Sequence, residues 1–323
     1  MNAPEYRDSR LTEQRNPRTG RIDVASSLEI VDLINTEDAL VAAAVRLERE
    51  RIAQAIELAV RGFEQGGRLI YAGAGTSGRL GVLDASECPP TFGTPPDMVV
   101  GIIAGGPEAL VKSIEGAEDD VGLAAAAIER TSVDARDFVL GIAASGTTPF
   151  VRAALDSARS RGASTGLLSC TDPPRDVAGQ CDVIIVPKVG PEAITGSTRM
   201  KAGTATKLVL NTITTGAMIR LGKVYGNLMV DLTATSDKLR DRGERIVMEV
   251  CRVDRGRARQ AIHDAAGSVK LAIVMVRLGV GQGDGRRALD QAHGSVRRVI
   301  GDPPPPLPPP PPSPPSPGPV ADA

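Results

Sequence analysis

The chain has 323 residues, of which 41% are hydrophobic and 24% charged, a balance typical of a folded protein with a full-sized core. Thirty-eight basic and 39 acidic residues leave a formal net charge of −1, which argues against binding to nucleic acid or a membrane surface through a basic field. With no Trp and few Phe or Tyr, a platform for stacking bases is not expected either.

Cysteine and histidine are too sparse and too scattered for the common metal, disulfide and triad sites. Only His263 and His293 are present, and no two cysteines form a C-x-x-C pair. We therefore expect no metal site built on these residues. The polar first 21 residues lack the apolar core of a signal peptide, and no apolar run is long enough to cross a bilayer. These features predict a cytoplasmic protein with reduced thiols that does not associate with membranes.

The first predicted helix spans residues 36–65, because this stretch is rich in Ala, Leu, Glu and Arg and Thr36 can cap its acidic first turn. A strand over 68–72 then enters a glycine-rich loop. A helix over 79–87 follows, which we expect Pro89 and Pro90 to stop.

Strands and helices then alternate, which indicates a parallel sheet covered on both faces. The apolar runs predict strands over 98–104, 138–144, 165–170 and 182–187, with helices opening at Pro107 and Pro149 between them. Long helices are expected over 197–222 and 226–248. The fold class is therefore α/β, a doubly wound, mostly parallel sheet flanked by helices.

Four segments are expected in chain order: an N-terminal segment (1–35), the sheet domain (36–248), a small helical module (249–302) and a proline-rich tail (303–323). The tail holds 13 of the 25 prolines, which cannot build a packed core and should form polyproline II or remain disordered. Such a tail is either a docking site for a proline-binding module or inert, and its low complexity favours the inert interpretation.

Two glycine- and hydroxyl-rich loops follow predicted strands and lead into helices, Gly75-Thr-Ser-Gly-Arg79 and Ala144-Ser-Gly-Thr-Thr-Pro149. Ligands of parallel sheets bind at this edge, where backbone N–H groups, hydroxyls and the positive end of a helix dipole favour a phosphate. Neither loop is a Rossmann or Walker A motif. The glycines alone could serve only tight turns, but two such loops at equivalent strand ends favour phosphate binding.

A third polar segment, Gly190 to Gly203, places a Glu, hydroxyls, an Arg and a Lys before a long helix. It is a capped helix start, with Ser197 or Thr198 as the cap, or an anion site, or both.

Two carboxylates are candidates for proton transfer. Glu87 closes the predicted helix, where the negative end of the dipole disfavours ionisation and suits a proton donor, although a solvated surface Glu is the plainer interpretation. Glu118 falls on an apolar stripe of helical period, provided that Gly116 does not break the helix, and a carboxylate on a buried stripe is either paired or functional. Asp119 and Asp120 beside it are expected to be solvated.

Several motifs resemble, in order over residues 11–300, the N-acetylmuramic acid 6-phosphate etherases of the sugar-isomerase (SIS) superfamily. They are Thr12-Glu-Gln-Arg-Asn-Pro17, Leu33-Ile-Asn-Thr-Glu-Asp-Ala39, Gly73-Ala-Gly-Thr-Ser-Gly-Arg-Leu-Gly81, Asp84-Ala-Ser-Glu-Cys-Pro-Pro-Thr-Phe-Gly93, Glu115-Gly-Ala-Glu-Asp119 and Ile194-Thr-Gly-Ser-Thr-Arg-Met-Lys-Ala-Gly-Thr204. The tail lies outside the resemblance.

The resemblance implies a carbon–oxygen lyase that converts N-acetylmuramic acid 6-phosphate and water into N-acetylglucosamine 6-phosphate and D-lactate, in the recycling or catabolism of cell-wall amino sugars. It places the family's two carboxylates on Glu87, as proton donor, and Glu118, as base. It also implies that no metal and no organic cofactor is needed. The phosphate is expected on Ser77, Ser145 and Thr148. Weaker candidates for the sugar and the lactyl carboxylate are Glu192, Ser197, Arg199 and Lys201.

Because SIS domains commonly pair, and because helix 197–222 is rich in small residues, we expect a homodimer whose interface helps enclose the site. Two alternatives remain: an SIS sugar-phosphate isomerase, which would often recruit a His, and a non-catalytic regulator that senses a sugar phosphate. An interaction protein that works through the proline tail is a remote third. Release of D-lactate from the phosphorylated amino sugar separates the etherase from all three.

Overall fold

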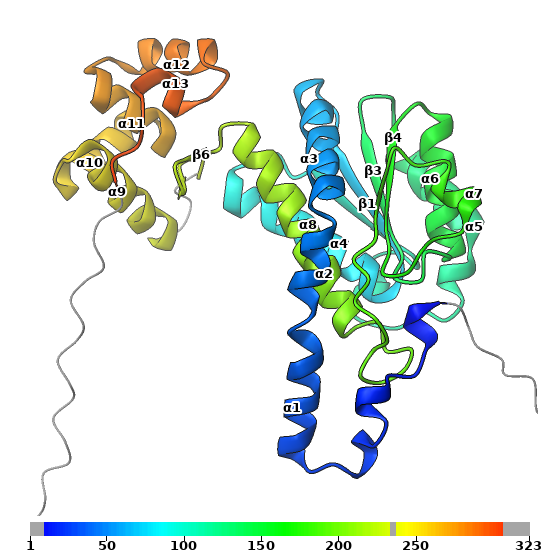
Figure 1. The fold of residues 1–323 in the computed structure, drawn as a ribbon. Coiled ribbons are helices and arrows are strands. Elements are labelled where there is room, and N and C mark those ends of the chain that lie inside the picture. Colours follow the sequence, from blue (N-terminus) through cyan, green and yellow to red (C-terminus); the bar gives the residue numbers. More distant parts are fainter. Residues whose placement is uncertain (1–9, 233–236, 306–323) are drawn as a thin grey trace, which may run out of the picture.

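The computed structural model describes residues 10–232 and 237–305. At its centre lies a sheet of five parallel strands in the order β2-β1-β3-β4-β5 (Figure 1). Leu69 pairs with Val99 on one side and with Phe138 on the other, so β1 is an interior strand next to the edge strand β2. The strands are β1 (Leu69–Gly73), β2 (Val99–Ile103), β3 (Phe138–Ile142), β4 (Ser164–Leu168) and β5 (Val183–Ile185). The five predicted strands and the α/β fold class are confirmed.

Helices cover both faces of the sheet (Figure 1). Helices α3 (Arg49–Glu64), α4 (Gly75–Phe92) and α8 (Lys201–Arg220) pack on one face, in a core with Leu69 and Tyr71. Helices α5 (Val121–Arg130), α6 (Pro149–Ser160) and α7 (Arg175–Ala178) pack on the other, with Ile70 and Ala72. The side chains of β1 alternate between the two cores, as the period of a strand requires. None of the described helices is long and apolar enough to cross a membrane.

The chain before β1 differs from the single helix expected over 36–65. Three short 3-10 turns, η1 (Leu11–Glu13), η2 (Pro17–Thr19) and η3 (Ile22–Val24), lead into α1 (Ser27–Asp38), α2 (Val41–Leu47) and α3. A capping box between Ser26 and Glu29 starts α1 much earlier than expected. Thr36 therefore lies inside α1, where its hydroxyl donates to Asp32 O at 2.7 Å rather than capping a helix.

Helix α4 begins earlier and ends later than expected. It starts at Gly75 and continues through Pro89 and Pro90 to Phe92, after which Gly93 adopts a left-handed conformation and donates to Pro89 O at 2.9 Å. A proline has the backbone φ of a helix, although it lacks the N–H bond and its ring crowds the carbonyl of residue i−4. Two such losses in the last turns do not stop the helix, so the expectation that they would was wrong.

The C-terminal helical module includes more of the chain than residues 249–302. An antiparallel pair that the sequence did not indicate, β6 (Val224–Tyr225) and β7 (Leu228–Met229), precedes α9 (Asp237–Cys251). The buried side of α9 shares a core with α10 (Arg255–Asp264), α11 (Val269–Leu278), α12 (Gln282–Gln291) and α13 (Val296–Ile300). The expected boundary at residue 248 thus falls inside α9. Pro303 lies beside Gly226, and residues 306–323 of the tail are outside the described part of the chain.

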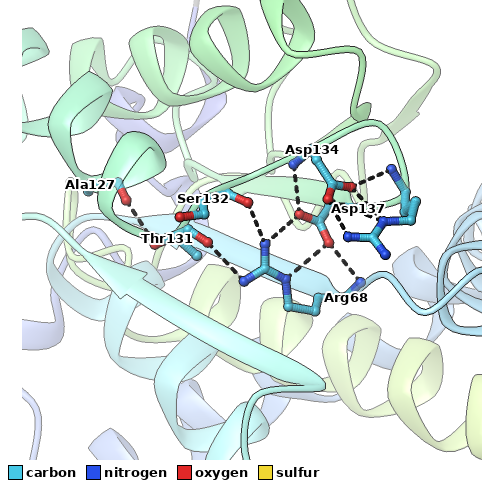
Figure 2. A network of polar contacts seen from close by, with 7 residues as sticks. Arg68, Ala127, Thr131, Ser132, Asp134 and Asp137 are labelled. Carbon is cyan, nitrogen blue, oxygen red and sulfur yellow. Dashed lines mark hydrogen bonds and ion pairs between the residues drawn. The ribbon is translucent and has the colours of Figure 1, made fainter.

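A polar network ties the start of β1 to the turn before β3 (Figure 2). The Arg68 guanidinium donates to Asp137 Oδ2 at 2.7 Å, to Thr131 O at 2.8 Å and to Ser132 O at 3.0 Å. Asp137 is 2% exposed and also accepts the backbone N–H groups of Arg68 (2.9 Å) and Asp134 (3.0 Å). The hydrogen bond to Asp137 raises the pKa of Arg68. This network fixes the register between neighbouring strands at the edge opposite their carboxyl ends.

We predict that Asp137→Ala lowers the free energy of unfolding by about 2–4 kcal/mol, because it leaves an arginine and two backbone N–H groups without their acceptor. Asp134→Ala is the matched control: its ion pair with Arg136 is largely exposed, so its loss should cost about 1 kcal/mol or less. Urea unfolding followed by circular dichroism measures both. Equal losses in the two variants would contradict the structural role given to Asp137.

Candidate active site

The crevice of this sheet lies between the carboxyl ends of β1 and β3. The chain leaves β1 into α4 on one face and leaves β3 into α6 on the opposite face. In open parallel sheets, ligands bind where successive helices change face in this way. The two glycine- and hydroxyl-rich loops are the two segments that flank this crevice.

The first loop brings the start of α4 very close to the end of β1. A side chain on Gly73 would lie 2.7 Å from Gly78 N, and one on Gly78 would lie 2.6 Å from Gly73 O, so both positions require glycine. The residue before the helix is Ala74, which offers no side chain to cap the first N–H groups. Ser77 is half-buried in this first turn, and its hydroxyl has no partner among the described residues. The turn is therefore open to an anion.

The second loop is similar at the end of β3. Gly146 has a φ of +70°, and the Ser145 hydroxyl lies 3.0 Å from that of Thr147. Thr148 is the N-cap residue of α6, but its side chain caps no N–H group. Ser77, Ser145 and Thr148 thus stand at two uncapped helix starts on adjacent strand ends.

The segment before α8 borders the first loop. A side chain on Gly203 would lie 3.6 Å from Thr76 Cγ2, which puts the start of α8 beside that of α4. Ser197 is half-buried and Arg199 is exposed, and neither side chain has a bonding partner within residues 10–232 and 237–305. Both are free to meet a ligand that lies against the first loop.

Glu192 and Lys201 in the same segment already have partners inside the protein. The Glu192 carboxylate, 1% exposed, accepts the backbone N–H groups of Lys201 and Ala202, each at 2.9 Å, and so caps α8. Burial raises the pKa of Glu192, against the lowering effect of these bonds. Serine and threonine, expected as the cap, are not used: the acceptor comes from a residue farther back in the loop.

The ammonium of Lys201 is fully buried and forms an ion pair with Glu37 of α1 at 2.6 Å. It also donates to Val189 O at 2.9 Å. Glu37 is bonded by the guanidinium of Arg18 as well, which together with Lys201 lowers the pKa of this carboxyl to about 2 despite its burial. Glu37 therefore stays ionised and balances a charge that would otherwise be buried alone.

The segment of η1, η2 and η3 holds the outer side of the same loop. The Thr19 hydroxyl donates to Ala193 O at 2.8 Å, and the Asn16 amide donates to Pro191 O at 3.1 Å. Gly196 N donates to Thr12 O at 3.2 Å. The N-terminal segment is thus part of the support of the site, a role that its polar sequence did not indicate.

Glu118 lines a pocket of about 160 Å³ at the start of α4, together with Gly75, Arg79 and Lys112. The helical stripe expected here is absent. Gly116 has a φ of +73° and ends any regular helix, so the interval contains only η4 (Pro107–Leu110) and η5 (Ala117–Asp119). Glu118 is consequently exposed to the pocket rather than buried on a stripe. Asp120, expected to be solvated, caps α5 by accepting Leu123 N at 2.9 Å.

Arg79 binds the segment that carries Glu118. Its guanidinium donates to Leu110 O and to Lys112 O, both at 3.1 Å. This residue was not singled out from the sequence, because an Arg in the first turns of a helix has no distinctive pattern. It links the glycine- and hydroxyl-rich loop at the start of α4 to the segment that carries Glu118.

Glu87 lies well away from that pocket. It is exposed and lies within α4 rather than at its end. The expectation that Glu87 closes this helix, beside the negative end of its dipole, was therefore wrong. Glu87 is twelve residues beyond Gly75, which at the helical rise corresponds to about 18 Å along the axis. Glu87 is accordingly not among the residues that line the pocket of Glu118.

A buried carboxylate fixes which side of α4 faces outward. Asp84 accepts the hydroxyl of Tyr71 at 2.8 Å and the amide of Asn211 at 2.5 Å. Burial raises the pKa of Asp84, while these two donors and Thr214 lower it. Asp84 points into the core between β1 and α8, whereas Glu87, about 60° around the helix from it, is exposed.

Among the residues that the structure describes, no three His, Cys, Asp or Glu side chains lie close enough together to hold a metal ion.

Comparison with protein families finds a match over residues 51–159 to the family of the glucokinase regulatory protein N-terminal SIS domain. Curated relatives match far more of the chain. An N-acetylmuramic acid 6-phosphate etherase of Yersinia pestis (strain Pestoides F) is 53% identical over 290 residues, which cover 90% of this chain and 98% of the relative. The protein of the same name from Yersinia pseudotuberculosis serotype O:1b (strain IP 31758) matches to the same extent.

Solved structures similar to this chain include a putative phosphosugar isomerase from Bacteroides fragilis, with a TM-score of 0.47 and 18% identity, covering 60% of this chain and 91% of that one. A phosphoheptose isomerase from Neisseria gonorrhoeae has a TM-score of 0.45 and 15% identity, with coverage of 59% and 99%.

We predict that Glu37→Gln lowers the free energy of unfolding by about 3–5 kcal/mol at neutral pH, because it leaves the Lys201 ammonium buried without its counter-ion. The double variant Glu37→Gln/Lys201→Met should recover most of that loss. Since the folded-state pKa of Glu37 is depressed, its stabilisation is fully present above the unfolded pKa of about 4.5 and is lost as pH falls towards about 2. Urea titrations between pH 3 and 7 measure this; a single-variant loss that is the same at every pH, or no recovery in the double variant, would contradict it.

Proposed function

We propose, from the premise that this chain belongs to the N-acetylmuramic acid 6-phosphate etherase family, that Glu87 and Glu118 divide the proton transfers of that family's reaction. The chain is a carbon–oxygen lyase. It cleaves the C3 lactyl ether of N-acetylmuramic acid 6-phosphate, and with water it yields N-acetylglucosamine 6-phosphate and D-lactate. The observation that carries this activity is the 53% identity to the Yersinia etherases over 98% of their length.

The phosphate is proposed to bind in the crevice between β1 and β3. Ser77 at the start of α4, and Ser145 and Thr148 before α6, would donate their hydroxyls there. Two uncapped helix starts on adjacent strand ends support this placement, because both direct backbone N–H groups and positive dipole ends at the same crevice. The phosphorylated substrate of the family also supports the expected cytoplasmic setting.

The chemistry explains why two carboxyl groups are needed. Opening of the sugar ring exposes an aldehyde at C1, which acidifies the proton on C2. Glu118 removes that proton, the C3–O bond breaks, and Glu87 protonates the departing lactate oxygen. Glu87 then activates a water that adds to C3 of the unsaturated aldehyde, and a proton returns to C2. Each positioned proton transfer is typically worth on the order of 10²–10⁴-fold in rate. The conjugated aldehyde stores the developing charge, so no step calls for a metal or an organic cofactor.

The segment before α8 is proposed to recognise the rest of the substrate. Arg199 is the cation there that has no internal partner in the described chain, which suits it to the lactyl carboxylate, with Ser197 beside it. Glu192 and Lys201, first considered as substrate contacts, are proposed instead to hold this segment in place, because both are bonded inside the protein.

The small residues of α8 do not provide the surface for the expected homodimer. The small residues of α8, among them Ala202, Ala205 and Ala217, are buried against α2, α3 and α4 of the same chain. They therefore pack within the chain, and a second copy would have to bind a different surface.

We predict that Glu87→Gln abolishes release of D-lactate from N-acetylmuramic acid 6-phosphate while exchange of the C2 proton with solvent continues, since only the protonation of the leaving oxygen is lost. Glu118→Gln should stop both. Lactate is measured enzymatically, and deuterium at C2 is measured by NMR in D₂O.

The matched control is Glu64→Gln, an exposed glutamate at the end of α3 that should behave as wild type. Continued C2 exchange in Glu118→Gln would remove that residue as the base. A wild-type protein that releases no lactate would refute the activity itself. An SIS isomerase would instead convert a sugar phosphate without lactate, and a regulator would bind it unchanged.

A further inference from the structure

A cavity lies at the end of α8 that is farthest from the candidate active site. Its volume is about 570 Å³, and its walls come from the ends of α3 and α8, from residues 222–226 and from residues 293–298, which lead into α13. Because α8 has 20 residues, Arg220 lies about 28 Å along the axis from Lys201, at the start of the helix. In Figure 1 the C-terminal helical module accordingly gathers beyond this end of α8. We call this space the α13 cavity; it is separate from the crevice at the strand ends.

Basic side chains dominate the walls of the α13 cavity. Arg220 comes from the last turn of α8, and Arg297 and Arg298 come from α13. His293 lines the same space. Among the described residues that line it, Glu64 is the one acid. Three guanidinium groups against one carboxylate leave the cavity with an excess of positive charge.

The three guanidinium groups are available to a ligand. Arg220 donates to Glu57, and Arg297 donates to Asp302, in ion pairs whose members are all at least half exposed. Exposed pairs of this kind contribute little to stability, so a ligand can replace them at low cost. The side chain of Arg298 has no partner within residues 10–232 and 237–305.

A buried charge behind the wall adds to this excess. Asp231 accepts the ammonium of Lys223 at 2.8 Å and forms an ion pair with that of Lys270 at 3.3 Å, so two lysines share one carboxylate. Lys270 is 8% exposed, and burial lowers its pKa against the opposing effect of Asp231. Its nitrogen lies 3.5 Å from the point where a side chain on Gly294 would begin, and both chain neighbours of Gly294 line the cavity. A negative charge in the cavity would favour the charged form of Lys270.

Contacts between the two parts of the chain fix the walls of the α13 cavity. Lys223 donates to Phe92 O, at the end of α4, at 3.1 Å, while its bond to Asp231 joins it to the C-terminal helical module. Gly222 has a φ of +71°, and a side chain there would lie only 3.1 Å from Gly294 O. The basic groups of α8 and α13 are therefore held around one space before any ligand binds.

We propose that the α13 cavity binds a small phosphorylated metabolite, at a site separate from that of ether cleavage. A guanidinium presents paired N–H donors that match two phosphate oxygens, and three such groups suit a dianion better than a single carboxylate. The hydroxyl of Ser295, whose oxygen accepts Arg298 N at 3.4 Å, still has its proton to donate. A volume of about 570 Å³ is within the range of small-molecule pockets, so it admits a carbon skeleton as well as the phosphate. This inference does not depend on the proposed function.

The two histidines of the chain provide a direct readout. His293 lines the α13 cavity, whereas His263 is 83% exposed on α10. Protein labelled with ¹³C-histidine is titrated with inorganic phosphate at fixed pH, with sodium chloride keeping the ionic strength constant, and the imidazole C–H signals are followed by NMR. The His293 signal should shift and saturate, and the His263 signal should stay in place. If neither signal moves, or if both move alike, the site is overturned.

A double variant tests the arginines. Arg297→Gln/Arg298→Gln should weaken the phosphate response of His293 by about tenfold or more, because a hydrogen bond to a charged group is worth at least a factor of that order. Arg286→Gln/Arg287→Gln is the matched control, since it removes the same charge from exposed positions on α12 and should respond as wild type. Equal responses in the two double variants would contradict the proposal.

A further variant separates this site from the proposed phosphate site in the crevice. Ser77→Ala should leave the phosphate response of His293 unchanged, because Ser77 lies at the start of α4 and outside the α13 cavity. A His293 response that disappears in Ser77→Ala would assign the binding event to the crevice and would overturn the second site.

Discussion

The helices that leave β1 and β3 cover opposite faces of one parallel sheet, and every feature of the site follows from this change of face. It opens a crevice at the two strand ends and directs the starts of α4 and α6 at the same place. The glycines at 73 and 78 let the first turn of α4 approach the strand, and the absence of a capping side chain leaves its N–H groups free. The anion site that we propose here therefore depends on backbone and topology more than on any single side chain.

Buried charges then position the outer parts of the molecule. Lys201 and Glu37 join α8 to α1, Glu192 closes the first turn of α8, and Asp84 joins α4 to β1 and α8. Each of these groups has its partners, which is the condition for keeping a charge inside a protein. Within the described residues, the side chain of Arg199 in the same region has no such partner. The groups that support the site thus differ from the proposed substrate contact in that their bonds are already made.

The sheet, its loops and the family could be predicted from the sequence because they are local features: short apolar runs, glycines before helices and contiguous motifs. The environments of Glu87 and Glu118 could not. The left-handed Gly116 replaces a helix with two 3-10 turns, and Pro89 and Pro90 continue a helix that they were expected to stop. The ion pair of Lys201 could not be predicted either, because Glu37 is 164 positions away in the chain and only the fold brings the two residues together.

The central claim is that the ether breaks between C3 and oxygen by elimination, followed by addition of water. The most direct test is the reaction in H₂¹⁸O with analysis of both products by mass spectrometry. Elimination and hydration place the solvent oxygen on C3 of N-acetylglucosamine 6-phosphate and leave D-lactate with the original ether oxygen. Label in the hydroxyl group of lactate, with none on the sugar at C3, would show that the other carbon–oxygen bond breaks and would contradict the account.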